Sequence, residues 1–413
     1  MTVIVQKFGG TSVADVDRIR AVADRVARTK EQGHDVVAVV SAMGDTTDEL
    51  MAMAQQLSGM PNRRELDLLL TAGERIAMSL LAIALNDRGL PAASYTGSQA
   101  GIITDSVHGQ ARIIDIRPGR IQESLSRGNI VIVAGFQGVS TAFDVTTLGR
   151  GGSDTTAVAL AAALGSDVCE IYTDVAGVYT ADPRVVPVAR KLHAVSYEEM
   201  LELAVSGAKV LQGRSVEYAR RYGVRIHVRS SFDDDDGTWI TEEDARMEQA
   251  IISGVAADES EAKITLEDVP DRPGVAAEIF RALADERVNV DMIVQNVSHQ
   301  GRTDLSFTAP RDDLSAIAST MERIVGKVGA ARYTTDDGIA KVSLVGAGMK
   351  SQPGVAADMF AALADEGINI EMISTSAIRV SCVVRAADAD RAVRAVHERF
   401  GLSEATAARE EHA

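Results

Sequence analysis

The stretch "TVIVQKFGGTSVADVDRIRAVADRV", residues 2–26, sets the architecture of the N-terminal region. A short β-branched run ends on Lys7, two glycines follow, and a helical pattern begins near Val13. Similar strand-like runs alternate with Ala/Leu/Arg-rich helical stretches up to residue 230, for example at 15–32, 64–88 and 153–164. Buried strands that alternate with helices predict a mostly parallel sheet with helices on both faces.

A strand that ends on Lys-x-Gly-Gly places an ammonium and several backbone N–H groups at the carboxyl edge of the sheet, where open α/β sheets bind ligands. Gly9 and Gly10 let the backbone approach a bulky anion, and the next helix adds its positive end. Lys7 precedes the glycines, so this is no Walker A loop, and no third glycine completes a dinucleotide fingerprint. The pattern predicts a phosphate site, although a simple tight turn explains a glycine pair about equally well.

A second glycine-rich turn, "TTLGRGGSDTTAVALAAAL", begins at residue 146 and repeats the design. Gly149, Gly151 and Gly152 surround Arg150. One arginine with a nest of N–H groups suits a carboxylate that is held by two hydrogen bonds. Asp154 stands at the helix start, where an N-capping role would explain it. Two anion cradles in one α/β domain predict a phosphate donor that faces a carboxylate acceptor.

The composition fits two or three domains with ample cores, because 46% of the 413 residues are hydrophobic. The net charge of −17 argues against nucleic acid or an acidic membrane as a partner. No apolar run is expected to span a bilayer, and no signal peptide is expected. Cys169 and Cys382 are expected to be small buried hydrophobes in a reducing compartment, and the histidines lack zinc spacing. These features predict a soluble cytoplasmic protein.

The last third of the chain holds a tandem repeat. "PGVAAEIFRALADERVNVDMI" at 273–293 recurs as "PGVAADMFAALADEGINIEMI" at 353–373, with 14 of 21 positions identical. Each copy reads strand, Pro-Gly turn, helix, two strands and helix, and the first continues into a possible fourth strand, "AARYTT". A spare strand at 249–257 could close the second sheet. Before the repeat, "FDDDDGTWIT" at 232–241 predicts a solvated linker or hairpin tip.

These motifs together resemble the aspartokinase family, of the actinobacterial kind that responds to lysine and threonine. The resemblance is carried by "KFGGTSV", "SAMGDTTDEL", "LLTAGERIAMSLLA", "TLGRGGSDTTA", "YTDVAGVYTADPRVV" and "VGAGMKSQPGV", in the family's order over nearly the whole chain. It implies an amino-acid-kinase fold, a three-layer αβα sandwich with a mostly parallel sheet, and two α+β ACT modules of βαββαβ order. The expected boundaries are 1–230 for the catalytic domain, 231–248 for a linker, 249–340 for the spare strand and first ACT domain, 341–406 for the second ACT domain and 407–413 for a charged tail.

The reaction that the resemblance implies is ATP-dependent phosphorylation of the β-carboxylate of L-aspartate to 4-phospho-L-aspartate. This is the first step toward lysine, threonine, methionine and isoleucine. The acceptor carboxylate is ionised at pH 7, so that no general base is needed. Alignment and charge stabilisation of a loose phosphoryl transition state then carry the catalysis. Mg²⁺ is expected on the ATP phosphates, mainly through water, and no protein ligand is assigned to it.

The resemblance also implies individual roles. The catalytic residues would be Lys7, beside the transferring phosphoryl group, and Asp154, which orders Lys7 or the substrate contacts. Glu74 would bind the α-ammonium of aspartate, although a first-turn acid favoured by the helix dipole explains it about as well. The full set implied to hold aspartate is Ser41, Thr47, Glu74, Arg150, Gly151, Gly152 and Ser153. The set implied to bind the nucleotide is Lys7, Phe8, Gly9, Gly10, Ser12, Thr173, Asp174, Tyr179, Asp182, Pro183, Arg184 and Lys209.

The ACT modules imply feedback control by threonine, by lysine or by both. Their Pro-Gly turns start helices whose N–H groups can hold an effector carboxylate. The effector residues implied are Asp271, Gly274, Ala276, Asn289, Val290, Asp291 and Gln295 in the first copy, and Asn369, Ile370, Thr375 and Ser376 in the second. The two asparagines would equally serve to turn the chain. Ala377 stands where the family carries a glutamate, which weakens the expectation of a lysine site.

ACT modules expose edges and faces, so a homodimer or a higher oligomer is expected. An α2β2 form with a β subunit from an internal start is also implied by the family, and Met247 stands where such a start could lie. Two other interpretations stay open. One is a kinase of another small amino acid, although such kinases generally lack the ACT tandem. The other is a catalytically inactive, amino-acid-sensing regulator, which would predict damaged cradles, whereas Lys7, Glu74, Arg150 and Asp154 are all present.

Overall fold

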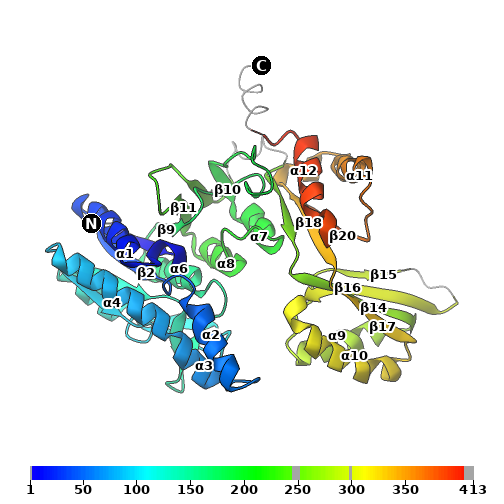
Figure 1. Cartoon of the computed structure of the whole chain (residues 1–413), viewed down its shortest axis with the longest axis horizontal. Coiled ribbons are helices and arrows are strands. Elements are labelled where there is room, and N and C mark those ends of the chain that lie inside the picture. Colours follow the sequence, from blue (N-terminus) through cyan, green and yellow to red (C-terminus); the bar gives the residue numbers. More distant parts are fainter. Residues whose placement is uncertain (1, 244–251, 297–299, 404–413) are drawn as a thin grey trace, which may run out of the picture. The chain divides into compact units, whose positions relative to one another are not determined.

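The computed structural model describes residues 2–243, 252–296 and 300–403, and they fall into two compact units (Figure 1). The first unit consists of residues 1–179, 191–204 and 209–248, and the second of residues 180–190, 205–208 and 249–413, as far as they are described. Met247, residues 249–251 of the expected spare strand and the charged tail at 407–413 lie outside the described residues.

An eight-stranded sheet organises the first unit. Its strands lie in the order β10-β12-β11-β9-β1-β2-β6-β3, and every neighbouring pair is parallel except β11 and β12. The bounds are β1 Val3–Phe8, β2 Asp35–Val40, β3 Ala92–Tyr95, β6 Ile130–Ala134, β9 Val168–Thr173, β10 Ala194–Ser196, β11 Arg225–Ser230 and β12 Thr238–Thr241. The central strands are β-branched and almost wholly buried, as expected where helices cover both faces.

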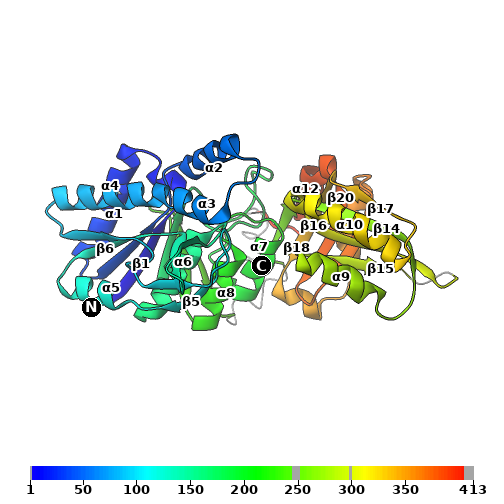
Figure 2. The same ribbon diagram turned by 90° about the horizontal axis from the view of Figure 1, so that it is seen from below.

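Helices lie on both sides of this sheet, which confirms the predicted three-layer αβα architecture (Figure 2). On one side α1 (Val16–Glu31) packs against α4 (Ala72–Asp87), and on the other α6 (Gly152–Leu164) packs against α8 (Gly213–Tyr222). The other helices are α2 Thr46–Leu57, α3 Arg63–Leu70, α5 Gly119–Ser126 and α7 Tyr197–Val205. A small sheet in the order β5-β4-β7-β8 contains β4 Ile102–Thr104, β5 Ile113–Ile116, β7 Gln137–Ser140 and β8 Val145–Thr147.

The helix that was expected to begin near Val13 begins at Val16. Asp15 caps it, because its side chain accepts a hydrogen bond from the backbone N–H of Arg18 at 2.8 Å. Residues 10–13 form a short 3-10 turn between the strand and this helix. The glycine pair is therefore followed by a tight turn and not directly by the positive end of α1.

The helical stretch expected at 64–88 divides at Thr71 into α3 and α4. Within the helical span Arg63–Asp87, an 18-residue window with a mean hydropathy of 1.7 could cross a membrane by length and composition, contrary to the expectation from the sequence. Half of it is buried, and Ala77, Leu81 and Leu85 lie in the core between α1 and the sheet. A buried helix of a globular core passes the same test, so the span is weak evidence for a membrane.

The aspartate run forms a hairpin tip. β11 and β12 pair antiparallel, with Ile226 opposite Ile240, and residues 231–237 connect them. Asp234 lies 3.3 Å from Arg25 and 3.6 Å from Arg28 of α1. β12, which falls inside the range expected to be a linker, thus belongs to the main sheet.

The second unit contains two α+β modules of the order that the repeat predicts. The first contains β14 Glu261–Pro270, α9 Val275–Asp285, β15 Ile293–Gln295, β16 Arg302–Pro310, α10 Leu314–Val328 and β17 Arg332–Asp336. The second contains β18 Ile339–Val345, α11 Val355–Asp365, β19 Met372–Thr375, β20 Arg379–Arg385 and α12 Ala389–Arg399. The spare strand is β13, Gly254–Asp258, and it pairs antiparallel with β18 at the edge of the second sheet.

Both cysteines lie in buried strands. Cys169 is on β9 and Cys382 on β20, and both are buried free thiols, as predicted. Burial raises the pKa of the Cys382 thiol to about 12, so it is protonated at neutral pH. Each behaves as a small hydrophobe of the core.

Ion pairs join the two modules of the second unit at equivalent positions. Lys341 of β18 lies 2.5 Å from Asp291 and 2.7 Å from Glu261, both in the first module. Lys263 of β14 pairs in turn with Glu371, the counterpart of Asp291 in the second copy. Lys341 is completely buried. Burial opposes its charge, but Glu261 and Asp291 together hold the pKa of Lys341 above its ordinary value.

The segment 180–190 of the kinase-like region belongs to the second unit. The carbonyl of Thr180 accepts a hydrogen bond from Val255 of β13 at 2.7 Å. Its hydroxyl lies 2.9 Å from His397 Nε2 on α12 and donates to the carbonyl of Leu402 at 3.2 Å. Burial lowers the pKa of His397, so the ring is neutral at pH 7. Residues of the kinase-like sequence are thus built into the regulatory fold.

Replacement of Lys341 by methionine leaves two carboxylates facing each other in a buried space. Removing one partner of a buried ion pair costs about 3–5 kcal/mol, because the other charge stays uncompensated. We expect the opening free energy of the β14 and β18 amides to fall by about this amount in Lys341→Met. Hydrogen exchange on the full chain measures it.

Lys263→Met is the matched control, since Lys263 is the partly exposed member of the equivalent pair, with 22% of its side chain exposed. Its loss is expected to cost about 1 kcal/mol or less. Equal loss of protection in the two variants would contradict the interpretation that the buried Lys341 cluster contributes more than the Lys263 pair to holding the two modules together.

Candidate active site

The carboxyl ends of β1, β2 and β9 meet at one edge of the main sheet, and the Lys-x-Gly-Gly segment lies there. Gly9 N donates to the carbonyl of Tyr172 at 3.2 Å, and Ser41 N donates to the carbonyl of Phe8 at 3.1 Å. The ring of Phe8 is fully buried and stacks on Tyr172 with centroids 4.9 Å apart. Phe8, expected at the nucleotide, therefore reaches this edge through its backbone alone.

Lys7 and Asp154 form the central ion pair of this edge. Their side chains are 2.6 Å apart and expose 11% and 9% of their surfaces. Asp154 lies in the first turn of α6, while Gly151, with φ of 67°, occupies the N-cap position, so the capping role considered for Asp154 is wrong. A Cβ on Gly9 would lie 3.5 Å from Lys7 Nζ, so the glycine loop passes beside the ammonium. The two glycine-rich segments are thereby joined at their charged residues.

The glycine loop leaves little room for side chains. A Cβ on Gly10 would lie 3.0 Å from the carbonyl oxygen of Ala42, which explains the glycine there. Ser12 is buried, and its hydroxyl lies 2.6 Å from the hydroxyl of Ser231, the residue after β11. Ser231 was missed in the sequence, because its partner lies 219 residues away.

Glu74 is a buried carboxyl with one open oxygen. It is 3% exposed, its Oε1 accepts a hydrogen bond from Ala42 N at 3.2 Å, and its Oε2 has no hydrogen-bond partner among the described residues. Burial raises the pKa of Glu74 to about 7. Its neighbour Gly73 permits close packing, since a Cβ there would lie 2.6 Å from the Cβ of Ala42. A buried, unpaired carboxyl oxygen is suited to a cation that arrives with a ligand.

The Arg-Gly-Gly segment is tightly packed on both sides of Arg150. A Cβ on Gly151 would lie 1.7 Å from the Cγ of Gln212 on the loop before α8, so only glycine fits. A Cβ on Gly135, just after β6, would lie 2.6 Å from the hydroxyl of Ser153. Arg150 itself is exposed at the tip of the turn. Close packing therefore fixes the backbone of this turn, while the guanidinium of Arg150 is exposed and can bind a ligand.

Seven of the residues expected at the nucleotide lie outside the Lys7 loop, and four of these seven are in the first unit. Thr173 and Asp174 follow β9 at the same edge, and the Thr173 hydroxyl donates to the Asp174 carboxylate at 3.0 Å. Tyr179 is half-buried and forms a backbone bridge with Lys191, while Lys209 is exposed. The end of β9 lies directly beside the Lys7 loop, because Gly9 N donates to the carbonyl of Tyr172.

The other three, Asp182, Pro183 and Arg184, belong to the second unit. Arg184 donates to the carboxylate of Asp182 at 2.7 Å, so the turn is closed by its own ion pair. The motif "YTDVAGVYTADPR" is thus divided between the units after Tyr179. Their place at a nucleotide stays a prediction.

The residues expected to hold an effector gather at equivalent places in the two modules. Asp271 and Gly274 precede α9, Gln295 ends β15, and Thr375 ends β19. Asp291 differs, because its carboxylate already pairs with Lys341. Burial alone would raise the pKa of Asp291, but Lys341 and Arg379 hold it below its ordinary value. Of the remaining positions, Ala276 lies on α9. Asn289 and Val290 precede β15, Asn369 and Ile370 precede β19, and Ser376 follows it.

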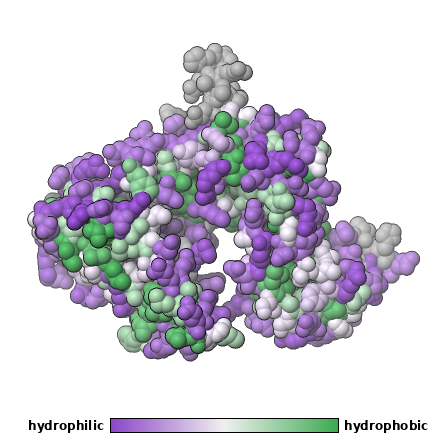
Figure 3. Space-filling model, viewed as in Figure 1, coloured by the Kyte–Doolittle hydropathy of each residue, from purple (hydrophilic) through white to green (hydrophobic). Residues whose placement is uncertain are grey.

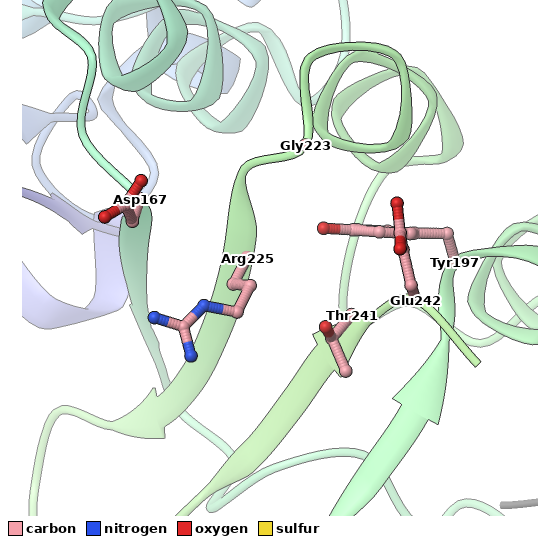
Figure 4. Close-up of a pocket in the computed structure, with 6 residues that line it drawn as sticks. All are labelled: Asp167, Tyr197, Gly223, Arg225, Thr241 and Glu242. Carbon is pink, nitrogen blue, oxygen red and sulfur yellow. The ribbon is translucent and has the colours of Figure 1, made fainter. Parts of the chain in front are cut away.

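A cavity of about 290 Å³ lies at the other edge of the main sheet (Figure 4). Val168 pairs with Arg225 at the start of β9 and β11, whereas Thr173 pairs with Ser230 at their carboxyl ends. The cavity is thus separated from Lys7 by the length of the strands. Figure 4 shows its lining residues, Asp167, Tyr197, Gly223, Arg225, Thr241 and Glu242.

Two charged residues behind the Arg150 turn, the buried Asp67 and the half-buried Arg214, were missed in the sequence. The side chain of Asp67 on α3 accepts hydrogen bonds from the loop at 108–109 and from Thr147 at the end of β8, and Arg214 on α8 donates to the carbonyls of Ala111 and Leu148. An acid inside the apolar run "ELDLLL" was the available signal for Asp67. No local pattern singles out Arg214.

Two glycine cradles at one edge of an αβα sandwich, followed by two ACT modules, define an amino acid kinase with an attached regulatory region. The amino acid kinase family matches residues 2–230, and the ACT domain families match residues 264–326 and 342–400.

The aspartokinase of Mycolicibacterium smegmatis is 57% identical over 407 residues, 97% of each chain. The aspartokinase of Corynebacterium glutamicum is 55% identical over the same share of both chains. Among solved structures, E. coli aspartokinase III in complex with aspartate and ADP matches with a TM-score of 0.83 and 26% identity, over 96% of this chain and 99% of that one. The chain belongs to the aspartokinase family.

Burial of Glu74 makes the stability of the empty protein depend on pH. The pKa of this carboxyl is about 7 in the folded chain, against 4.5 for an unperturbed glutamate, so the folded form binds more protons between these values. Stability then falls as pH rises from about 4.5 to about 7. Glu74→Gln removes this loss, and we expect it to be more stable than the native chain by up to about 3 kcal/mol at pH 8.

Denaturant unfolding followed by Trp239, the single tryptophan and a residue of the first unit, measures this difference. The two proteins are expected to be equally stable below pH 4.5. Glu49→Gln, on an exposed residue of α2, is the control and is expected to show no such gain. A native stability at pH 8 equal to that of Glu74→Gln would disprove the raised pKa.

Proposed function

We propose that the chain transfers the γ-phosphoryl group of ATP to the β-carboxylate of L-aspartate. The observation that carries this proposal is the buried Lys7–Asp154 pair, which joins two glycine cradles at one sheet edge. Membership of the aspartokinase family and the likeness to a relative in complex with aspartate and ADP support it. An inactive regulator would need neither the buried pair nor the open oxygen of Glu74.

Lys7 is the residue that meets the charge developing on the transferred phosphoryl group. Asp154 orients its ammonium from 2.6 Å, and Gly9, Gly10 and Ser12 offer N–H and O–H donors next to it. No proton has to be removed from an acceptor carboxylate at pH 7. Catalysis on this account is positioning plus electrostatic stabilisation.

Aspartate is held at both of its ends. Glu74 binds the α-ammonium through its open Oε2, which would pair a buried carboxyl with its missing cation. Arg150 clamps a carboxylate from the tip of its turn, because a guanidinium holds two carboxylate oxygens at once. The surrounding acceptor site is formed by Ser41, Thr47, Gly151, Gly152 and Ser153.

ATP lies over the carboxyl end of β9. Thr173, Asp174, Tyr179 and Lys209 contact it from the first unit, and the turn at 182–184 reaches its phosphates. Mg²⁺ is bound through ATP oxygens and water, since it dehydrates reluctantly. The described residues contain no group of three or more His, Cys, Asp or Glu side chains placed to hold a metal ion.

The ACT modules make the enzyme sensitive to its pathway's end products. Threonine binds the first copy, around Asp271, Asn289 and Gln295, and lysine binds the second copy weakly. A relative, E. coli aspartokinase III, has been solved in complex with lysine and aspartate, in its T-state. Here Ala377 replaces the family's glutamate, and a methyl group accepts no hydrogen bond from a second ammonium.

The chain functions in the cytoplasm as a homodimer or a higher oligomer, and an α2β2 form through a start at Met247 is included in this proposal.

Exposed apolar side chains gather over α2, α3 and α4 of the first unit (Figure 3). Large apolar patches on a soluble protein mark contacts with a partner. The patch consists of Met53, Leu57, Met60, Leu68, Leu69, Ile76 and Ile83. The boundaries proposed for the chain are those expected from the sequence, except that the catalytic domain is extended to include β12 and the second ACT domain begins at Ile339, the first residue of β18.

Arg150→Ala is expected to raise the KM for aspartate about ten- to a hundredfold and to leave the KM for ATP nearly unchanged. The reason is that the lost bidentate clamp serves the acceptor alone. ADP release, assayed with a panel of amino acids, measures both constants and the substrate. No ADP release with aspartate by the native enzyme would refute the proposed reaction, and a change in the ATP constant alone would refute the role of Arg150.

Ala377→Glu tests the effector assignment. The native enzyme is expected to respond to threonine, while lysine alone inhibits weakly, because one charge-assisted hydrogen bond is missing. The variant is expected to bind lysine about ten- to a hundredfold more tightly. Inhibition curves with each amino acid singly and together decide this, and strong lysine inhibition of the native enzyme that Ala377→Glu leaves unchanged would contradict it.

A further inference from the structure

Asp67 on α3 is 1% exposed, and among the described residues its side chain accepts hydrogen bonds only from a distant loop at 108–109 and from Thr147 at the end of β8. His108 Nδ1 lies 2.7 Å from its Oδ2, and Gly109 N donates to both oxygens at 3.0 and 3.2 Å. The hydroxyl of Thr147 donates to its Oδ1 at 2.6 Å. A buried carboxylate with this many donors fixes the groups that surround it, because leaving any of them unpaired is costly.

The loop at 108–111 and the end of β8, which meet at Asp67, are also bonded to each other. Ala111 N donates to the carbonyl of Thr147 at 2.8 Å. From the other side Arg214 donates to the carbonyls of Leu148 at 3.0 Å and Ala111 at 2.8 Å. A Cβ on Gly149 would lie 3.1 Å from the carbonyl of Gly109, so the contact is close there too. The segment that precedes Arg150 is therefore fixed by hydrogen bonds to α3, through Asp67, and to α8, through Arg214.

Asp67 is also tied to the other end of the acceptor site through its own helix. α3 continues past Thr71 into α4, whose first turn carries Glu74. One buried carboxylate thus links the backbone before Glu74 to the backbone before Arg150. These are the two residues proposed to hold the ammonium and a carboxylate of aspartate.

We propose that Asp67 is a positioning residue that sets the distance between Glu74 and Arg150, and with it the fit of the amino-acid substrate. The proposal rests on the proposed function of these two residues. A displacement of about 1 Å in a binding group can cost a hundredfold in rate, so a rigid tie between them has kinetic value. A general-base role for the His108–Asp67 pair is not required, because the acceptor carboxylate is already ionised.

Thr147→Val tests the tie without touching either binding residue. Valine has the shape of threonine but cannot donate to Asp67, which would leave this buried carboxylate short of one donor. We expect the KM for aspartate to rise about tenfold, with the KM for ATP changed less than about twofold. Thr147→Ser keeps the hydroxyl and is expected to retain the native constants.

Thr146→Val is the matched control. Thr146 is the preceding residue of β8, is fully buried and bonds through its hydroxyl to Thr104 at 2.6 Å, not to Asp67. Thr146→Val makes the same chemical change in the same strand as Thr147→Val. Thermal unfolding of the two variants therefore shows whether they are similarly destabilised. We expect the KM for aspartate to stay within about twofold of the native value in this control.

Asp67→Asn gives a second measurement, in which one oxygen acceptor is replaced by a donor that faces other donors. Its KM for aspartate is expected to rise at least as much as in Thr147→Val. Equal increases in Thr146→Val and Thr147→Val, a native KM in Thr147→Val, or parallel changes for aspartate and ATP would each overturn the proposal. A native enzyme that does not phosphorylate aspartate would instead refute the proposed function and leave these comparisons without a substrate.

Discussion

The ion pair between Lys7 and Asp154 is the interaction on which the proposed active site of the first unit depends. It joins the end of β1 to the first turn of α6 across 2.6 Å, where both side chains are largely shielded from water. Shielding strengthens the attraction, since the effective dielectric is lower than in bulk water. In a chain with a net charge of −17, a phosphate site needs a local positive field. An ammonium that is held in place beside a glycine loop meets this need without a basic surface.

The second unit consists of two copies of one module, which are joined by ion pairs at equivalent positions. The two modules repeat one sequence, and each sends a lysine of its first strand to an acid of the other, Lys263 to Glu371 and Lys341 to Asp291. The two pairs are not equal, because Lys341 is completely buried and has Glu261 as a second partner. Asp291 therefore has a structural task beside any task at an effector.

Family boundaries and compact units do not coincide in this chain. The amino acid kinase family matches residues 2–230, yet residues 180–190 pack with β13 and α12 in the second unit. Residues 180–190 belong to the second unit because Thr180 forms hydrogen bonds with Val255, His397 and Leu402, all of which are in that unit. A boundary drawn from sequence likeness follows chain order, whereas a unit follows contacts.

The sequence by itself determined the features that depend on neighbours along the chain. Strand and helix alternation indicated the αβα sandwich, the repeat indicated two modules with a spare strand, and the two glycine segments indicated a site at the edge where Lys7 and Asp154 meet. The helical stretch expected at 15–32 likewise matches α1, from its N-cap Asp15 to its C-cap Gln32.

Only the tertiary structure decided which buried groups have partners. The open oxygen and the raised pKa of Glu74 depend on its burial next to Ala42, which is 32 residues away in the chain. The hydrogen bond between Asp67 and Thr147 joins residues that are 80 positions apart. The physical reason is that burial and hydrogen bonding are properties of atoms brought together in space, and residue type and spacing along a single chain do not encode those distances.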